Sequence, residues 1–430
     1  MKKQSVRTQA FILTCANALT RGLGFILRIL LSRLMGAEAL GVMELSHSAH
    51  ILSITPVTAG LPMAVSRMTA REGNDRPLRA GIKIALHISL MMMPAWLLLS
   101  PLTARFLRDA RVLPSLILFT PCILILGLSA VLNGYCYGQG NTLPPALSEL
   151  IEQLLRFGIS AAILSSLPRL SIAYRAAVPA LSTALAEGTG LALVMLLIRN
   201  RPRSAGDISP ARKELLALSA PPVASRLLTT LLRTLSGALI PVRLASSGLS
   251  NAQSMELYGM YQGMVMPLLF LPGIVTGSLG TVATSAVASR RGAAQKHMAI
   301  RLFSSALLCG IFGMLLLRVL SPFLAVRLYG LPELSSLITA AAPLTLLFSL
   351  QHAVNGVMNG LGLQKKLLLP AVSSTVISLI CMYVWAAMPT LRITGVIRAM
   401  QLGQTAGLLW GLFLTYQEIK RAYKTAGSQN

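Results

Sequence analysis

Acidic side chains are scarce in this sequence, and charge of either sign is low. Only 13 of its 430 residues are Asp or Glu, and all charged residues together amount to 12%. Soluble domains carry about 25% charged residues, whereas here hydrophobic residues reach 54% and the mean hydropathy is +0.67. This composition excludes an ordinary soluble domain and predicts a protein whose solvent is the membrane.

Motifs for catalysis, metal binding and disulfide formation are also missing. The five cysteines are odd in number, show no CxxC spacing and fall in or beside apolar segments, so we interpret them as buried small residues. No Ser/His/Asp order, carboxylate pair on a soluble domain, metal-ligand spacing or Walker loop is present. The sequence therefore predicts no enzyme, no cofactor and no ATP-driven pump.

Apolar runs recur along the whole chain. Each is about twenty residues long, enough to span the hydrocarbon as a helix, and none alternates like a barrel strand. The run after the basic N-terminus carries Arg21 and Arg28 and continues too far for a signal peptide, so we expect an uncleaved first span. We predict an all-α polytopic membrane protein with about twelve helices, near residues 8–32, 40–64, 79–100, 112–137, 144–167, 177–198, 215–244, 256–286, 299–319, 336–361, 366–388 and 393–416.

The net charge of +25 has a topological explanation. Basic residues gather in alternate loops, and basic loops stay in the cytoplasm, so no nucleic-acid partner is implied. The opposite loops also hold some arginines, so a cytoplasmic N-terminus is favoured only by the balance of basic residues between the two sets of loops. We expect a multi-pass protein of the bacterial inner (plasma) membrane with both termini cytoplasmic.

Internal similarity divides the chain into two halves. Asn133-Gly134-x3-Gly138-x-Gly140 recurs as Asn355-Gly356-x3-Gly360-x-Gly362, each time at the end of a fourth helix. We predict two pseudo-symmetric six-helix bundles around a central cavity. The expected divisions are an N-terminal lobe 1–198, a cytoplasmic linker 199–214, a C-terminal lobe 215–417 and a cytoplasmic tail 418–430.

Four arginines inside the predicted spans are the first candidate site. An arginine at mid-membrane costs from about 2.5 to over 10 kcal/mol, so it faces a cavity or a partner. Arg21 and Arg28 are seven residues apart and share a helix face, and Arg226 and Arg233 repeat that spacing. Because planar guanidiniums bind phosphate oxygens in pairs of hydrogen bonds, we expect these four to bind an anionic headgroup. Snorkelling toward lipid headgroups is the alternative, which we favour only near helix ends.

Two further polar pairs are candidates. Glu152 and Arg156 in the fifth span are spaced i,i+4, which suits either substrate contact or an intrahelical ion pair that holds the bundle. Glu44 and His47 in the second span are i,i+3 neighbours and are candidates for proton or cation coupling. For the histidine, packing with a hydrogen bond is the interpretation we prefer.

The ordered motifs resemble a known family. The opening reads Thr20-Arg21-x-Leu23-Gly24-Phe25-x2-Arg28, and Gly60-Leu61-Pro62-x-Ala64-Val65-Ser66-Arg67 and Glu152-Gln153-x2-Arg156 follow. This order resembles the stage V sporulation protein B branch of polysaccharide-biosynthesis flippases, over essentially the whole chain. The resemblance implies the two-lobed fold shared by multidrug, oligosaccharidyl-lipid and polysaccharide exporters and by MurJ-type lipid II flippases. It also implies that Arg21 and Arg28 line a cavity.

The leading expectation is an alternating-access flippase that moves an undecaprenyl-pyrophosphate-linked saccharide, in wall synthesis or sporulation. Its partners would be that lipid-linked substrate, membrane lipids and cell-wall synthesis enzymes. A cation-coupled multidrug exporter of the same fold is the main alternative, but its cavity should offer carboxylates, and Glu44, Glu149, Glu152 and Glu187 are nearly the only acids in the spans. The other alternative is a non-transporting scaffold for wall synthesis.

Overall fold

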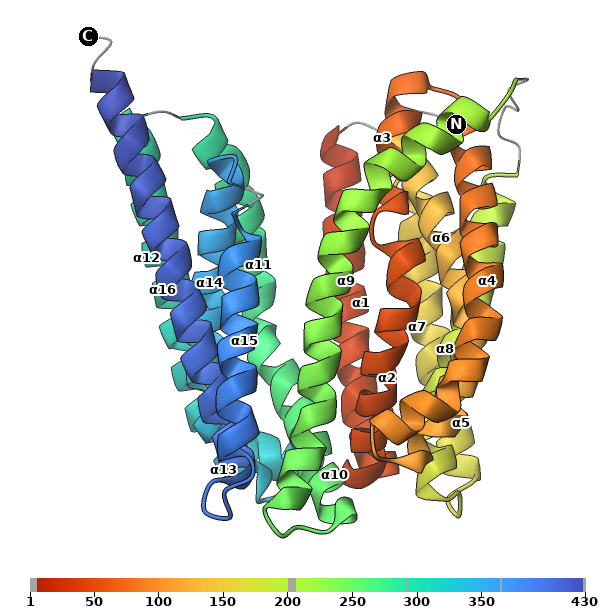
Figure 1. Cartoon of the computed structure of the whole chain (residues 1–430), viewed down its shortest axis with the longest axis vertical. Coiled ribbons are helices and arrows are strands. Elements are labelled where there is room, and N and C mark those ends of the chain that lie inside the picture. Colours follow the sequence, from red (N-terminus) through yellow and green to blue (C-terminus); the bar gives the residue numbers. More distant parts are fainter. Residues whose placement is uncertain (1–5, 200–205, 291, 364–365, 428–430) are drawn as a thin grey trace. The chain divides into compact units, whose positions relative to one another are not determined.

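A computed structural model describes residues 6–199, 206–290, 292–363 and 366–427. Within these residues every regular element is a helix (Figure 1). Contacts between residues divide the chain into two compact units, Met1–Ala238 and Leu239–Asn430, and each unit is described by itself.

The N-terminal unit is a bundle of long helices joined by short connections. Its helix α2 is followed after a two-residue interruption by the short α3, and a 3-10 turn precedes α5. The elements are α1 (Val6–Met35), α2 (Ala37–Thr58), α3 (Leu61–Glu72), α4 (Arg76–Phe106), η1 (Ala110–Val112), α5 (Leu113–Leu118), α6 (Thr120–Gly138), α7 (Leu143–Ser166), α8 (Ile172–Leu197) and the greater part of α9 (Ser209–Ser246).

The C-terminal unit has the same character and includes two π-helical turns. Its elements after the end of α9 are α10 (Asn251–Gly259), η2 (Met260–Val265), α11 (Met266–Ala288), α12 (Gly292–Phe323), η3 (Leu324–Tyr329), α13 (Leu334–Ala341), α14 (Pro343–Gly360), α15 (Leu368–Trp385) and α16 (Arg392–Gly427).

The surface of the helices is apolar to a degree that water would not tolerate. Leu98, Val319 and Met91 are at least three-quarters exposed, and they are three of many large apolar side chains on the outside. So many exposed apolar side chains fit lipid contact. Among the described residues, eight helical segments are long and apolar enough to cross a membrane.

The predicted spans coincide with helices, but several spans are built from two or three consecutive helical elements. The second span, expected over 40–64, is interrupted at Ala59 and Gly60. A Cβ on Gly60 would lie 2.4 Å from the carbonyl oxygen of Ser219, so glycine permits the backbone of α9 to approach there. This close approach between distant segments leaves no signal in the local hydropathy.

The repeated glycines make equivalent close contacts in each unit. A Cβ on Gly134 of α6 would lie 2.4 Å from the carbonyl oxygen of Pro62 at the start of α3. In the other unit, a Cβ on Gly356 of α14 would lie 2.4 Å from the carbonyl oxygen of Gly280 on α11. The motif is therefore a device for helix packing in both halves.

The start of α9 is fastened to the N-terminal unit. Arg71 donates to both carboxylate oxygens of Glu214, at 2.7 and 2.8 Å, and Arg76 donates to the carbonyl oxygen of Asp207 at 2.7 Å. Leu215 is fully buried in a hydrophobic cluster of the N-terminal unit that also contains Val65 and Leu78. The contact boundary thus falls within α9, after Ala238, rather than in the polar connection. Residues 200–205 of the predicted linker lie outside the described residues, and the lobe boundaries stay a prediction.

The sequence had led us to expect five buried cysteines, and this expectation is wrong for Cys15. Cys122 and Cys136 are buried and Cys309 and Cys381 half-buried, but Cys15 is exposed on α1. An apolar neighbourhood in sequence does not distinguish the lipid-facing side of a helix from its packed side, because both are hydrophobic.

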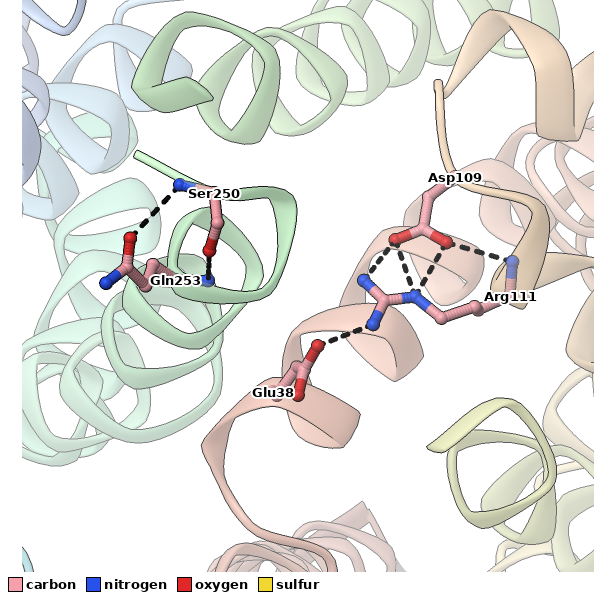
Figure 2. A network of polar contacts seen from close by, with 5 residues as sticks. All are labelled: Glu38, Asp109, Arg111, Ser250 and Gln253. Atoms are coloured by element: carbon pink, nitrogen blue, oxygen red, sulfur yellow. Dashed lines mark hydrogen bonds and ion pairs between the residues drawn. The ribbon is translucent and has the colours of Figure 1, made fainter. Parts of the chain in front are cut away.

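Polar contacts fix helix ends in each unit (Figure 2). In the N-terminal unit, Arg111 bridges Asp109, at 2.7 Å, and Glu38 at the start of α2, at 2.5 Å. Hydrogen bonding to Asp109, with burial opposing it, raises the pKa of the Arg111 guanidinium. In the C-terminal unit, Ser250 and Gln253 form a reciprocal capping box at the start of α10.

Candidate functional site

The ionisable residues of the predicted spans converge inside the N-terminal unit. Helix α7 packs on α1 and α8, and α8 also packs on α2 and α6. These helices carry all four glutamates that the sequence analysis singled out, together with Arg21, Arg28 and Arg156. The result is a polar cluster within a bundle whose other interior contacts are largely apolar.

The first pair in this cluster joins α1 to α2. The Nη1 atom of Arg28 lies 2.7 Å from the Oε1 atom of Glu44. The Glu44 side chain is 5% exposed and that of Arg28 34% exposed, so the carboxylate is buried while the guanidinium keeps an open side. Arg28 is therefore a partly satisfied cation, and it is the ion-pair partner of Glu44.

The second pair joins α7 to α8. The Nη2 atom of Arg156 lies 2.7 Å from the Oε1 atom of Glu187, and both side chains are mostly buried. The intrahelical Glu152–Arg156 ion pair that the i,i+4 spacing suggested is not formed. Glu152 instead accepts a hydrogen bond of 2.6 Å from the Ser148 hydroxyl. A glutamate on the neighbouring helix reaches the guanidinium better than one on its own helix.

The histidines of α2 lie next to this cluster. His47 is within electrostatic range of Glu44, Arg28 and Arg156. The ring of His50 stacks on Phe119, with centroids 4.1 Å apart, and its Nδ1 atom lies 3.3 Å from the Ser53 hydroxyl. His50 is thus a packing residue, whereas His47 has charged neighbours.

A pocket of about 240 Å³ opens between the end of α6 and the start of α7. Its lining residues are Asn133, Tyr137, Pro145, Glu149 and Glu152. Glu149 is also within electrostatic range of Arg21 on α1. The pocket therefore adjoins the polar cluster, and four of its five lining residues are polar or charged.

A glycine on α8 makes room for the Glu152 carboxylate. A Cβ at Gly190 would lie 1.8 Å from the Oε1 atom of Glu152 and 2.6 Å from the Ser148 hydroxyl. Since no side chain fits there, Gly190 allows the carboxylate to lie against the backbone of α8. At Gly188, two residues earlier, the nearest atom to an added Cβ is 3.8 Å away.

The other three predicted arginines differ from Arg28. Arg21, Arg226 and Arg233 are exposed, and no carboxylate of the described residues lies within ion-pair distance of them. Arg226 and Arg233 belong to the part of α9 that is grouped with the N-terminal unit. Thr234, next to Arg233, donates to the Ser48 carbonyl oxygen on α2 at 2.9 Å.

Sequence reasoning missed three members of the site. Glu187 was noted only as one of the rare acids, and Ser148 and Gly190 were not singled out. The signal available for Glu187 was its position in an otherwise apolar run, because a buried charge requires a partner. Gly190 gave no signal, since glycines are common in membrane helices.

Nothing in the cluster suggests a resident metal. In the part of the chain that the structure describes, no three His, Cys, Asp or Glu side chains group closely enough to hold a metal ion.

The geometry is that of a helical membrane protein with a charged interior. Comparisons with known proteins show the family to which the chain belongs. The model of the polysaccharide biosynthesis protein family matches residues 6–284. The chain belongs to this family. It is 28% identical to stage V sporulation protein B of Bacillus subtilis (strain 168) over 426 residues, covering 94% of this chain and 82% of that protein. The resemblance found in the sequence is confirmed.

Solved structures show the fold. The lipid II flippase MurJ, in an inward closed conformation, matches with a TM-score of 0.75 and 14% identity, covering 96% of this chain and 90% of that one. An inward-facing MATE family multidrug resistance transporter of the MOP superfamily matches with a TM-score of 0.71 and 16% identity, covering 94% and 95%. The predicted all-α polytopic membrane fold is confirmed.

Proposed function

We propose that this protein is a flippase that carries a lipid-linked saccharide across the inner membrane by alternating access. The observation that supports this most is the set of exposed arginines, Arg21, Arg226 and Arg233, within predicted membrane spans that hold few other charges. Unpaired guanidiniums at such positions are costly unless an anion joins them. The fold shared with a lipid II flippase and the family membership support the same proposal.

The substrate class follows from the charge. A pyrophosphate offers several oxygens to planar guanidinium forks, which bind phosphate oxygens in pairs. An undecaprenyl-pyrophosphate-linked peptidoglycan precursor or polysaccharide unit would place that group against the arginines while its tail stays in the bilayer. Arg28, held by Glu44, would contribute its open side and fix the position of α1.

The polar cluster gives the cycle a means of coupling. Glu44 and His47 lie at the junction of α1 and α2, and Arg156 lies within range of the same imidazole. A change in the charge of His47 or Glu44 would alter the Arg28 contact directly. We therefore retain Glu44 and His47 as the coupling pair, and Glu152 and Arg156 as residues of the substrate region.

The orientation belongs to the same proposal. The turn between α3 and α4 is flanked by Arg71, Arg76 and Arg79, and basic loops favour the cytoplasm. We place both termini on that side, so the pocket beside Glu149 opens toward the side where a wall precursor is loaded. Cell-wall synthesis enzymes on either side are the partners we expect.

One observation favours a second candidate, a cation-coupled exporter of cationic compounds. The sequence made this alternative look weak because acids are rare, yet the structure brings the four glutamates of the spans together in one unit. The fold shared with MATE transporters is compatible with it. Two of the four are neutralised by arginine, which is why we rank this candidate second.

The test is translocation in proteoliposomes of a fluorescent lipid-pyrophosphate saccharide. Native protein is compared with Arg233→Ala and Arg21→Ala, and with Arg105→Ala as a control on an exposed arginine outside the site. We expect movement by the native and control proteins and loss in the two site variants with folding preserved. Movement of a cationic dye but not of the lipid by well-folded native protein would establish the second candidate instead.

A further inference from the structure

The two glutamates at the pocket differ from the other two of the cluster. Glu44 and Glu187 each lie 2.7 Å from an arginine. Glu149 and Glu152 have no arginine or lysine of the described residues within 4 Å, and the only hydrogen bond recorded for them is the one from Ser148 to Glu152. The pocket wall therefore carries hydrogen-bond acceptors that no cation of the described residues contacts.

A third acceptor on the same wall is also unused. The side-chain oxygen of Asn133 is buried and has no hydrogen-bond partner. A buried acceptor without a donor costs free energy, so native structures usually satisfy it with a group from outside the chain when the protein cannot. Tyr137 lines the same pocket and has a hydroxyl oxygen of its own.

These groups select the chemistry of the occupant. Carboxylate and amide oxygens accept hydrogen bonds, so the ligand must donate several and should carry positive charge. A phosphate or a second carboxylate would be repelled. The volume of about 240 Å³ is several times the space of about 30 Å³ that one water occupies, which suits an ammonium on a ring or chain better than a bare ion.

We infer that the pocket lined by Asn133, Glu149 and Glu152 is a subsite for a primary ammonium carried by the saccharide headgroup. This inference rests on the proposed flippase function. The substrate class becomes a zwitterionic headgroup, whose pyrophosphate meets arginine and whose free amine enters the pocket. Arg21, one of the arginines proposed to meet the pyrophosphate, is within electrostatic range of Glu149, so the two subsites are neighbours in this proposal.

Gly190 is a positioning residue for this subsite. It holds no group that touches a ligand, but the space it leaves decides where the Glu152 carboxylate lies. Alanine there would push the carboxylate off the α8 backbone without changing any charge. Alanine at Gly188 would meet only the Ile125 methyl at 3.8 Å, so it is the matched control.

The experiment compares two undecaprenyl-pyrophosphate saccharides that differ only in one amine, free in one and N-acetylated in the other. Dissociation constants are measured with the purified full chain in detergent. We expect the free amine to bind about tenfold more tightly to native protein, the effect of one hydrogen bond to a charged group. That preference should vanish in Glu152→Gln and Gly190→Ala and persist in Gly188→Ala.

The outcomes separate this inference from the proposed function. Equal binding of the two saccharides, or a preference that survives in both Glu149→Gln and Glu152→Gln, overturns the subsite. Translocation of both saccharides at equal rates supports the flippase function and refutes the ammonium subsite. A preference in binding without any translocation supports the subsite and refutes the flippase.

Two soluble competitors identify the source of the cation. If the water-soluble amino sugar without lipid binds as tightly as the lipid-linked one, the pocket takes free amines and the headgroup assignment is wrong. If sodium ions displace the free-amine saccharide from native protein but not from Glu152→Gln, the pocket is an inorganic cation site and the inference is also wrong. Weak binding of the soluble sugar and indifference to sodium support the inference.

Discussion

Arg28 and Glu44 lie sixteen residues apart in sequence and 2.7 Å apart in space, and their ion pair ties α1 to α2. The carboxylate is almost completely buried, so it needs the guanidinium, whereas the guanidinium is one-third exposed and retains donors for another acceptor. The pair therefore has a structural role, and Arg28 keeps donors for a second role. Removing Arg28 should consequently have different effects from removing Glu44.

Charge reversal separates those roles. We expect Arg28→Ala to lower stability by about 1–3 kcal/mol, because it leaves a buried carboxylate unpaired. The exchanged pair Arg28→Glu with Glu44→Arg should recover much of that stability but not translocation, since the guanidinium would then stand on α2. Thermal unfolding in detergent and lipid flipping are the two measurements. Full recovery of flipping by the exchanged pair would mean that Arg28 only holds the helices together.

The partner of Arg156 can be determined by double-mutant cycles. We expect a coupling energy of about 1–3 kcal/mol between Arg156 and Glu187, as for a hydrogen bond to a charged group. Between Arg156 and Glu152 we expect about 0.5 kcal/mol or less, as for an i,i+4 pair on one helix. Alanine variants at the three positions, singly and in pairs, give both values from unfolding. The reverse order would show that the intrahelical pair dominates.

Much of the fold could be predicted from the sequence, because the patterns that specify helices are local. Apolar runs of membrane length gave the helices, and the glycine repeat of Gly134 and Gly356 gave the duplication. Interruptions such as the one at Gly60 could not be predicted, because they depend on Ser219 of α9, about 160 residues further along the chain, approaching that segment. The end of the N-terminal unit within α9 depends on the same long-range packing.

The charged residues of the candidate site can be named from the sequence, but their ion-pair partners cannot. Rare charges in apolar helices identified Arg28, Glu44, Glu152 and Arg156, since the membrane penalises each of them. Spacing along one helix offered an intrahelical ion pair for Glu152 and Arg156 as one alternative, whereas the structure shows ion pairs between helices. Such contacts depend on helix rotation, which hydropathy does not specify.

The glycine repeat gives a prediction about packing. Gly134→Ala and Gly356→Ala should each destabilise the protein by about 1–3 kcal/mol, because the added methyl would meet a carbonyl oxygen at 2.4 Å. Gly158→Ala is the control, since nothing lies within 4 Å of its Cβ, and it should stabilise helix α7 by about 0.5–1 kcal/mol. The melting temperatures of the three variants in one detergent test this, and equal tolerance at all three sites would contradict it.

The network in Figure 2 predicts a role for Arg111 in stability alone. Arg111→Ala removes contacts to both Asp109 and Glu38, and we expect a loss of about 1–2 kcal/mol, reduced by partial exposure to solvent. Arg105→Ala, at an exposed site without a recorded ion pair, should change the melting temperature little. Translocation by folded Arg111→Ala protein should remain near native, and its loss would place Arg111 in the transport route.

Membrane potential should drive the return of the empty protein. In the proposed cycle the pyrophosphate neutralises the arginines in the loaded form, so the empty form carries net positive charge inward when it resets. An inside-negative potential favours that step by about 2.3 kcal/mol per charge per 100 mV. We expect turnover in proteoliposomes to fall severalfold when a potassium diffusion potential is collapsed. The residual turnover of Arg226→Gln should depend less on the potential, because that variant removes one moving charge. If the voltage dependence of Arg226→Gln equals that of the native protein, Arg226 does not move through the field.

Unchanged turnover in the native protein would show that the reset step moves no net charge across the membrane. The energy for transport would then have to come from substrate supply or from an ion gradient acting at Glu44 and His47.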